Sequence, residues 1–190
     1  MDYKKEIPEI QKKLKRKLSD TRYQHTLGVA YTAGCLAMKY DLDSKKAIVA
    51  GLLHDCAKYM APEEMLQKAL KFKLDVSDAE MVKPDLLHAK LGEYYAKNKY
   101  KVDDLDILQS IRFHTTGKPD MSLFEKIIYI ADYIEPGRDK MPRLDLIRRV
   151  AFEDIDKCLK MILEDTVSYL KKSSMKFDNT TIETYNYYCK

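Results

Sequence analysis

The amino-acid sequence predicts an all-α protein built as one domain. Apolar residues recur with the spacing of helix faces along most of the 190 residues, and neither a long β-branched alternation nor an Asn-Gly hairpin turn occurs. The 6 Gly and 6 Pro residues fall where helices are expected to end. No linker separates two cores, so we expect residues 1–190 to form a single domain.

The composition is that of a globular protein that works in water. Apolar residues make up 45% and charged residues 34% of the chain, and the net charge is +4. No apolar run approaches the ~18 residues that span a bilayer, and the N-terminus lacks the apolar core of a signal peptide. The four cysteines form no CxxC pair, which favours reduced thiols. We therefore expect a cytoplasmic protein with no membrane partner.

The densest basic run is KKLKRKL at residues 12–18. Its spacing is typical of the solvated face of an N-terminal helix. Nucleic-acid binding is the weaker interpretation, because no aromatic residues that stack on bases are interleaved with the charges. We therefore expect no nucleic-acid partner.

The first half of the chain is expected to hold four helices. They cover about residues 7–18, 20–40 and 44–55, and the fourth begins at residue 62. Ser19 or Asp20 is expected to cap the second helix, and Asp43 or Ser44 the third, because these side chains accept hydrogen bonds from unpaired backbone N–H groups. Pro62 suits a first helical position, where no N–H is needed.

The second half shows the same kind of helix signals. Helices are expected to open at residue 86, to cover about 105–114, 123–135 and 143–172, and to end the chain after residue 178. The expected caps are Asp85, Asp103 or Asp104, the capping box SLFE at 122–125, and Asp178.

The histidines are few and similarly placed. All four, His25, His54, His88 and His114, lie near a helix terminus or on an otherwise apolar helix face. Any one of them alone is explained as a buried histidine that is hydrogen-bonded to backbone. As a set they favour a metal site, because imidazole is the commonest protein ligand of transition metals.

Two of the carboxylates lie in apolar surroundings. Asp55 follows the stretch AGLLH, and Asp132 lies within IIYIADYI. An ionised carboxylate buried there without a partner costs several kcal/mol, and a metal ion removes that cost. His54 and Asp55 are adjacent, so on a regular helix they point ~100° apart. They can share one ion only at a helix end, or else Asp55 bridges two ions.

Five segments carry a family resemblance: RYQHTLGVA, AGLLHDCAK, LLHAKLGEYYA, IRFHTTGKPDMS and KIIYIADYIEPGR. In this order they resemble the HD superfamily of α-helical, metal-dependent phosphohydrolases, and within it the YqeK-type branch of symmetrical dinucleoside-tetraphosphate hydrolases. The resemblance is strong over residues 22–138 and weaker towards the tail. It implies an HD core of about 19–138, with C-terminal helices over 143–190 that complete the site. Ala57 replaces a glycine that many HD proteins have, a departure that fits this branch.

The resemblance also implies ligands and a cofactor. His25, His54, Asp55 and Asp132 are expected to bind the first metal, usually iron in this branch, with Mn, Co or Zn as substitutes. His88 and His114 are expected across the site, on a second ion through Asp55 or on phosphate. The ligands are nitrogen and oxygen without thiolate, which argues against structural zinc. The expected catalytic set is Asp55, Lys58, His88 and His114.

Several positively charged and polar residues are candidates for contacts with a phosphate or nucleotide. Lys58 lies one helical turn beyond Asp55, although an ordinary surface lysine explains it equally well. The other expected nucleotide contacts are Arg22, His88, His114, Thr115, Thr116 and Arg138, and the resemblance adds Asp178, Thr181 and Tyr185 in the tail. Glu135 and Glu93 are candidates for supporting the ligands, with a solvated surface role as the alternative.

The expected function is cleavage of diadenosine tetraphosphate into two ADP, by attack of metal-bound hydroxide on an inner phosphate. One alternative is another nucleotide phosphohydrolase or phosphodiesterase, which acts on a dNTP or a cyclic dinucleotide. A second alternative is a nucleotide-binding HD module without catalysis, which the intact histidine and aspartate set argues against. A homodimer is left open.

Overall fold

The computed structural model describes residues 3–172 and 178–190, and this part of the chain is entirely helical without strands. The elements are α1 (Tyr3–Lys15), α2 (Asp20–Lys39), α3 (Ser44–Leu53), α4 (Pro62–Lys71), α5 (Asp78–Val82), the 3₁₀ helix η1 (Pro84–Leu87), α6 (His88–Lys99), α7 (Leu105–Phe113), α8 (Leu123–Ile134), α9 (Leu144–Ala151), α10 (Ile155–Lys172) and α11 (Asn179–Cys189). This confirms the all-α class. No helix in the described ranges has the length and apolar character that crossing a membrane requires.

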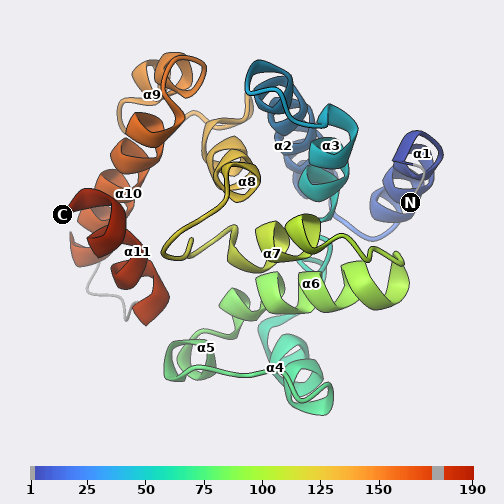
Figure 1. Cartoon of the computed structure of the whole chain (residues 1–190). Helices are drawn as coiled ribbons and strands as arrows, with labels where there is room; N and C mark the ends of the chain where they lie inside the picture. Colours follow the sequence, from blue (N-terminus) through green and yellow to red (C-terminus); the bar gives the residue numbers. More distant parts are fainter. Residues whose placement is uncertain (1–2, 173–177) are drawn as a thin grey trace.

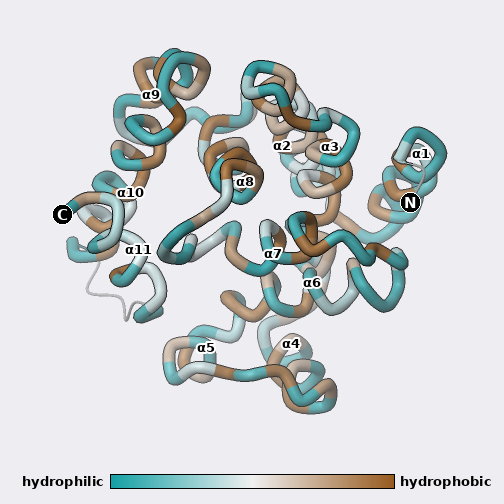
Figure 2. The backbone as a smooth tube through the Cα atoms, in the orientation of Figure 1, coloured by the Kyte–Doolittle hydropathy of each residue, from teal (hydrophilic) through white to brown (hydrophobic). Residues whose placement is uncertain are grey.

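Helix α8 lies at the centre of the molecule. It packs against α2, α3 and α7 on one side and against α9 and α10 on the other (Figure 1). Its apolar residues are almost fully buried, Ile127, Ile128 and Ile130 among them. The apolar faces of the surrounding helices turn towards it, whereas hydrophilic residues lie outward (Figure 2). Asp132 lies on α8, so its position is fixed by the packing of five neighbouring helices.

Helices α2 and α3 make the most extensive helix pair of the fold. Small residues at the contact allow a close approach: a Cβ added to Gly51 would lie 2.6 Å from Cα of Ala30. Ser19 and Asp43 cap the two helices, as predicted, through side chains that accept backbone N–H groups. This pairing fixes where α3 ends, and the next residue is His54.

Most of the other predicted helix starts are confirmed. Pro62 occupies the first turn of α4, Asp104 caps α7, Ser122 and Glu125 form the capping box of α8, and Asp178 caps α11. The four cysteines are free thiols, as expected.

Three expectations about elements were wrong, and one helix was not predicted. Asp85 does not cap a helix, because Pro84–Leu87 first form a 3₁₀ turn, and α6 begins only at His88. The segment 143–172 is broken at residues 152–154, where the Asp154 side chain accepts from Lys157 N–H at 2.9 Å and starts α10. Helix α5, with its Ser77–Glu80 capping box, was not predicted, and α1 begins at Tyr3 rather than near residue 7.

Candidate active site

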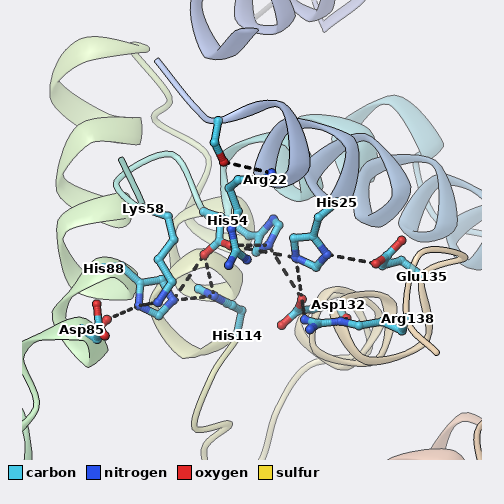
Figure 3. A network of polar contacts seen from close by, with 12 residues as sticks. Arg22, His25, His54, Lys58, Asp85, His88, His114, Asp132, Glu135 and Arg138 are labelled. Atoms are coloured by element: carbon cyan, nitrogen blue, oxygen red, sulfur yellow. Dashed lines mark hydrogen bonds and ion pairs between the residues drawn. The ribbon is translucent and has the colours of Figure 1, made fainter. Parts of the chain in front are cut away.

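The four histidines converge with Asp55 and Asp132 into one cluster (Figure 3). His25 comes from the second turn of α2, His54 and His114 directly follow α3 and α7, and His88 is the first residue of α6. All four are buried or nearly so, and Asp55 is 2% exposed. Segments from residue 25 to residue 132 thus contribute to one site.

Three of the histidines are oriented by the same type of local hydrogen bond. In each, the ring Nδ1 donates to the backbone carbonyl three residues earlier: His54 to Gly51 at 2.6 Å, His114 to Ile111 at 2.8 Å, and His88 to Asp85. The last carbonyls of a helix lack intrahelical partners, so they are available to a histidine placed just past the end. Because Nδ1 carries the proton, each Nε2 is left as an acceptor that faces the cluster.

Asp55 stands between two groups of histidines. Its Oδ2 lies 3.5 Å from His54 Nε2 and 3.9 Å from His25 Nε2. Its Oδ1 lies 3.3 Å from His88 Nε2 and 3.7 Å from His114 Nε2. The other carboxylate, Asp132, has its Oδ1 3.1 Å from His25 Nε2 and 3.9 Å from His54 Nε2.

The unpaired atoms at this cluster fit a metal ion. The Nε2 atoms of His25 and His54 and Oδ1 of Asp55 are buried without a hydrogen-bond partner. Such orphaned polar atoms are rare and costly in folded proteins. Three donor groups have their ligand atoms within 4.8 Å of one another: His25–His54–Asp55, His54–His114–Asp132 and Asp55–His88–His114. Imidazole and carboxylate donors of this kind suit a divalent transition metal.

The electrostatics keep both carboxylates ionised. Burial by itself would raise the pKa of Asp55, but His54, His114 and His88 outweigh it and hold this pKa well below its usual range. The pKa of Asp132 is lowered likewise, because nearby rings and the Arg138 guanidinium outweigh its burial. Two negative groups therefore lie among the histidine nitrogens.

Two of the histidines differ in their protonation. Burial lowers the pKa of His88 to about 3, although Asp55 acts against this shift. At His25 burial also favours the neutral ring, but the carboxylates of Asp132 and Glu135 outweigh it, and the pKa is raised. His88 is consequently neutral at ordinary pH, whereas His25 holds a proton more readily.

Three cationic side chains of the predicted site lie at the cluster (Figure 3). Arg22 Nη1 donates to Asp55 Oδ2 at 2.8 Å, and Arg138 Nη2 donates to Asp132 Oδ1 at 2.8 Å. Lys58 Nζ lies 3.2 Å from His88 Nδ1, and burial lowers its pKa. The arginines keep 37% and 31% of their side chains exposed, so they form a cationic rim around the acidic centre.

Of the two threonines after His114, Thr115 lines a cavity together with cluster residues, whereas Thr116 does not. Thr115 lines two cavities, one of 590 Å³ beside Asp132 and one of 180 Å³ beside α5, and Thr116 lines the smaller. Gly117 follows with φ 63°, and a Cβ there would lie 2.7 Å from Thr184 Cγ2. Helix α11 is therefore packed directly on the turn that follows His114.

The tail residues are placed differently from one another. Asp178 lines the smaller cavity and accepts from Ser77 Oγ at 3.0 Å. Thr181 is buried in α11, and Tyr185 packs against the hydrophobic core. Among the described residues, neither of these two side chains contacts the histidine cluster, so their role as nucleotide contacts stays a prediction.

Sequence reasoning missed the tyrosines of the larger cavity. Tyr129, Tyr133 and Tyr169 line it together with Met141 and Leu170, and it opens onto His114, Asp132 and Arg138. A signal was present, since Tyr129 and Tyr133 are four residues apart on α8 and flank Asp132.

The two glutamates proposed as supports have different partners. Glu135 lies against His25, whereas Glu93 accepts from Arg112 Nη1 at 2.8 Å and lies outside the cluster.

The fold and the cluster are those of a known class of protein. The model of the HD domain family matches residues 22–137, which hold all six clustered residues. The chain therefore belongs to the HD-domain family, as the sequence motifs suggested.

Relatives within this family are similar along almost the whole chain. The symmetrical bis(5'-nucleosyl)-tetraphosphatase of Halalkalibacterium halodurans is 42% identical over 91% of both chains, and that of Bacillus subtilis is 40% identical over 92% of both. A crystal structure from Clostridium acetobutylicum, described as a predicted HD superfamily hydrolase involved in NAD metabolism, has a TM-score of 0.90 at 41% identity, covering 95% of both chains. These likenesses confirm the resemblance to the symmetrical tetraphosphatase branch.

Proposed function

We propose that this protein hydrolyses dinucleoside tetraphosphates symmetrically and converts diadenosine tetraphosphate into two ADP. The observation that carries the proposal is the cluster of four histidines and two aspartates, in which Nε2 of His25, Nε2 of His54 and Oδ1 of Asp55 are buried without a partner. This cluster lies in a chain that aligns over nine-tenths of its length with enzymes named for that reaction.

The cluster is the proposed site of a divalent metal. We assign His25, His54, Asp55 and Asp132 to the first ion, iron in the proposal, and leave His88 and His114 for a second ion that shares Asp55. A metal held there neutralises phosphate oxygens and lowers the pKa of a water molecule from ~15.7 to about 7. The geometry of Asp55, with one oxygen facing each pair of histidines, supports this assignment.

The chain's own cations are proposed to bind the phosphates. Arg22, Lys58 and Arg138 surround the acidic centre, and phosphate oxygens are natural partners for their N–H groups. As the bond to an inner phosphorus opens, negative charge grows on the leaving ADP, and Arg138 is placed to stabilise it. His88 is neutral, so its Nε2 can hold a metal or accept a proton, but it is no proton donor near neutral pH.

The larger cavity is the proposed binding site of one nucleoside of the substrate. Its volume of 590 Å³ falls in the range of small-molecule sites, and its tyrosines offer faces on which a purine stacks. His114, Thr115 and Arg138 lie at its boundary with the cluster, which lets a phosphate chain run from the cavity to the metal ligands. Thr116, Asp178, Thr181 and Tyr185 are proposed for other parts of the substrate. A homodimer likewise stays a prediction.

A nucleotide panel with product analysis tests this function. The protein, purified without chelator and supplied with Fe²⁺ or Mn²⁺, is given diadenosine tetraphosphate, dATP and a cyclic dinucleotide. ADP should be the sole adenine product from the first substrate, and ¹⁸O from solvent should enter one ADP of each pair. AMP plus ATP would contradict symmetrical cleavage. Faster turnover of dATP or the cyclic dinucleotide would favour another phosphohydrolase, and binding without turnover a non-catalytic module.

A further inference from the structure

His25 is oriented differently from the other three histidines. It lies inside α2, where backbone carbonyls are engaged in the helix, so no free carbonyl at a helix end is available to its Nδ1. Its Nδ1 instead lies 3.1 Å from Oε1 of Glu135, more than a hundred residues away in the sequence (Figure 3). A carboxylate accepts, so the ring donates from Nδ1, and Nε2 is left unprotonated towards the cluster.

The Glu135 carboxylate is buried and hydrogen-bonded at both oxygens. It is 3% exposed, and its second oxygen, Oε2, accepts from Gly137 N–H at 2.6 Å. Two glycines make room for it: a Cβ at Gly28 on α2 would lie 2.3 Å from Oε2, and one at Gly137 would lie 3.0 Å from both oxygens. Only residues without a side chain allow the carboxylate to approach α2 this closely.

The turn that carries Glu135 is held from outside the HD-domain match. Arg148 on α9 donates through Nε to the carbonyl of Ile134 at 3.0 Å, and through Nη2 to the carbonyls of Glu135 and Arg138 at 2.9 Å each. Because three carbonyls of one turn share one guanidinium, the backbone under Glu135 is fixed. The C-terminal helices therefore support the position of this carboxylate.

We infer that Glu135 is a positioning residue for His25: its Oε1 accepts a hydrogen bond from Nδ1–H and so directs Nε2 at the metal. Metal-bound histidines characteristically donate their second ring N–H to such a carboxylate, and removing it typically weakens metal affinity 10- to 100-fold. The inference rests on the metal site of the proposed function. A purely structural Glu135, one that only closes the turn after α8, would affect stability without affecting metal affinity.

Two measurements on the full chain separate these roles. The first is the Mn²⁺ affinity, determined by competition with a chelator, and the second is the melting temperature of the metal-free protein. Glu135→Ala should weaken Mn²⁺ binding 10- to 100-fold. Glu135→Gln should weaken it less, since its one oxygen can serve His25 or Gly137 N–H but not both. The matched control is Glu125→Gln, a buried glutamate in the first turn of α8, the helix that Glu135 follows; its Oε2 accepts from Ser122 N–H at 2.7 Å. It should lower the melting temperature and leave Mn²⁺ affinity unchanged.

A second variant tests the same geometry from the opposite side. Gly28→Ala places a methyl group where Glu135 Oε2 lies, so it should displace the carboxylate and weaken Mn²⁺ binding as well. In the Glu135→Ala background the same substitution should cost no further affinity, and it should raise stability, because alanine is the better helix former. Additive losses of affinity, or a Glu135→Ala protein that binds Mn²⁺ like the wild type, would overturn the inference. A wild type that binds no Mn²⁺ would overturn the metal site itself.

Discussion

Arg138 holds Asp132 through two separate contacts. Its Nε donates to the backbone carbonyl of Asp132 at 3.0 Å, and its Nη2 donates to the carboxylate Oδ1 at 2.8 Å. Arg22 makes a similar contact with Asp55 from the other side of the cluster. Each acidic ligand of the proposed metal site is thus paired with one arginine, which places positive charge beside the point where phosphate would bind.

Replacement of Arg138 tests this relationship. Arg138→Ala should lower kcat by ~10²-fold, about 2.7 kcal/mol, because the contact with the phosphate strengthens as charge develops in the transition state. Steady-state kinetics with diadenosine tetraphosphate measure the effect, with the exposed Arg149→Ala as a control that should match the wild type. A rise in KM with kcat unchanged would instead show that Arg138 binds the ground state and the transition state equally well.

Substitution of Asp55 should reduce turnover more than substitution of His88. Asp55 belongs to two of the three donor groups and His88 to one, so Asp55→Asn should lose at least ~10³-fold in turnover and His88→Ala less. The exposed Asp139→Asn serves as the control for loss of a nearby carboxylate. Turnover and metal content are measured on the same preparations. Equal losses at the two positions would indicate that both ions are required, and near-normal turnover by Asp55→Asn would refute the site.

Metal affinity should depend on pH through His25 rather than His88. In the metal-free protein the pKa of His25 is raised above 6.5, so a proton competes with the metal as pH falls through that raised value. The pKa of His88 is about 3, so this ring is already neutral and releases no proton on metal binding near neutral pH. The His25 proton should therefore contribute a fall of about one per pH unit to the logarithm of the Mn²⁺ affinity below the His25 pKa. A Mn²⁺ affinity that does not fall with pH in this range would contradict competition by this proton.

Two glycines at the α2–α3 contact should respond differently to alanine. At Gly51 the added Cβ meets backbone of Ala30 at 2.6 Å, so Gly51→Ala should cost about 1–3 kcal/mol of unfolding free energy and displace α3, the helix that His54 directly follows. At Gly34 the Cβ meets the side-chain Cγ1 of Ile48 at 2.9 Å, and a side chain can shift where backbone cannot, so Gly34→Ala should cost less. Urea denaturation of the two variants provides the comparison, and equal costs would contradict a backbone clash at Gly51.

The sequence by itself determined most helices and the residues of the cluster. Caps such as Ser19, Asp43 and Ser122 bond to backbone two or three residues away, so a local pattern suffices to predict them. Asp154 caps α10 by the same rule, but this cap was overlooked. The 3₁₀ turn of Pro84–Leu87 was also missed, because the sequence was taken to continue directly into the helix of His88. The histidines and the two aspartates were identifiable because their residue types conflict with the apolar sequence around them.

The tertiary structure alone decided how these residues work together. Three contacts could not be predicted from neighbouring residues in the sequence. Asp55 lies between two pairs of histidines, Glu135 contacts His25, and Arg148 donates hydrogen bonds to the turn after α8. The physical reason is that local caps join atoms within one turn of chain, whereas these contacts depend on helices that meet only when the core has packed. The cavity lined by Tyr129 and Tyr169 likewise exists only once α10 lies against α8.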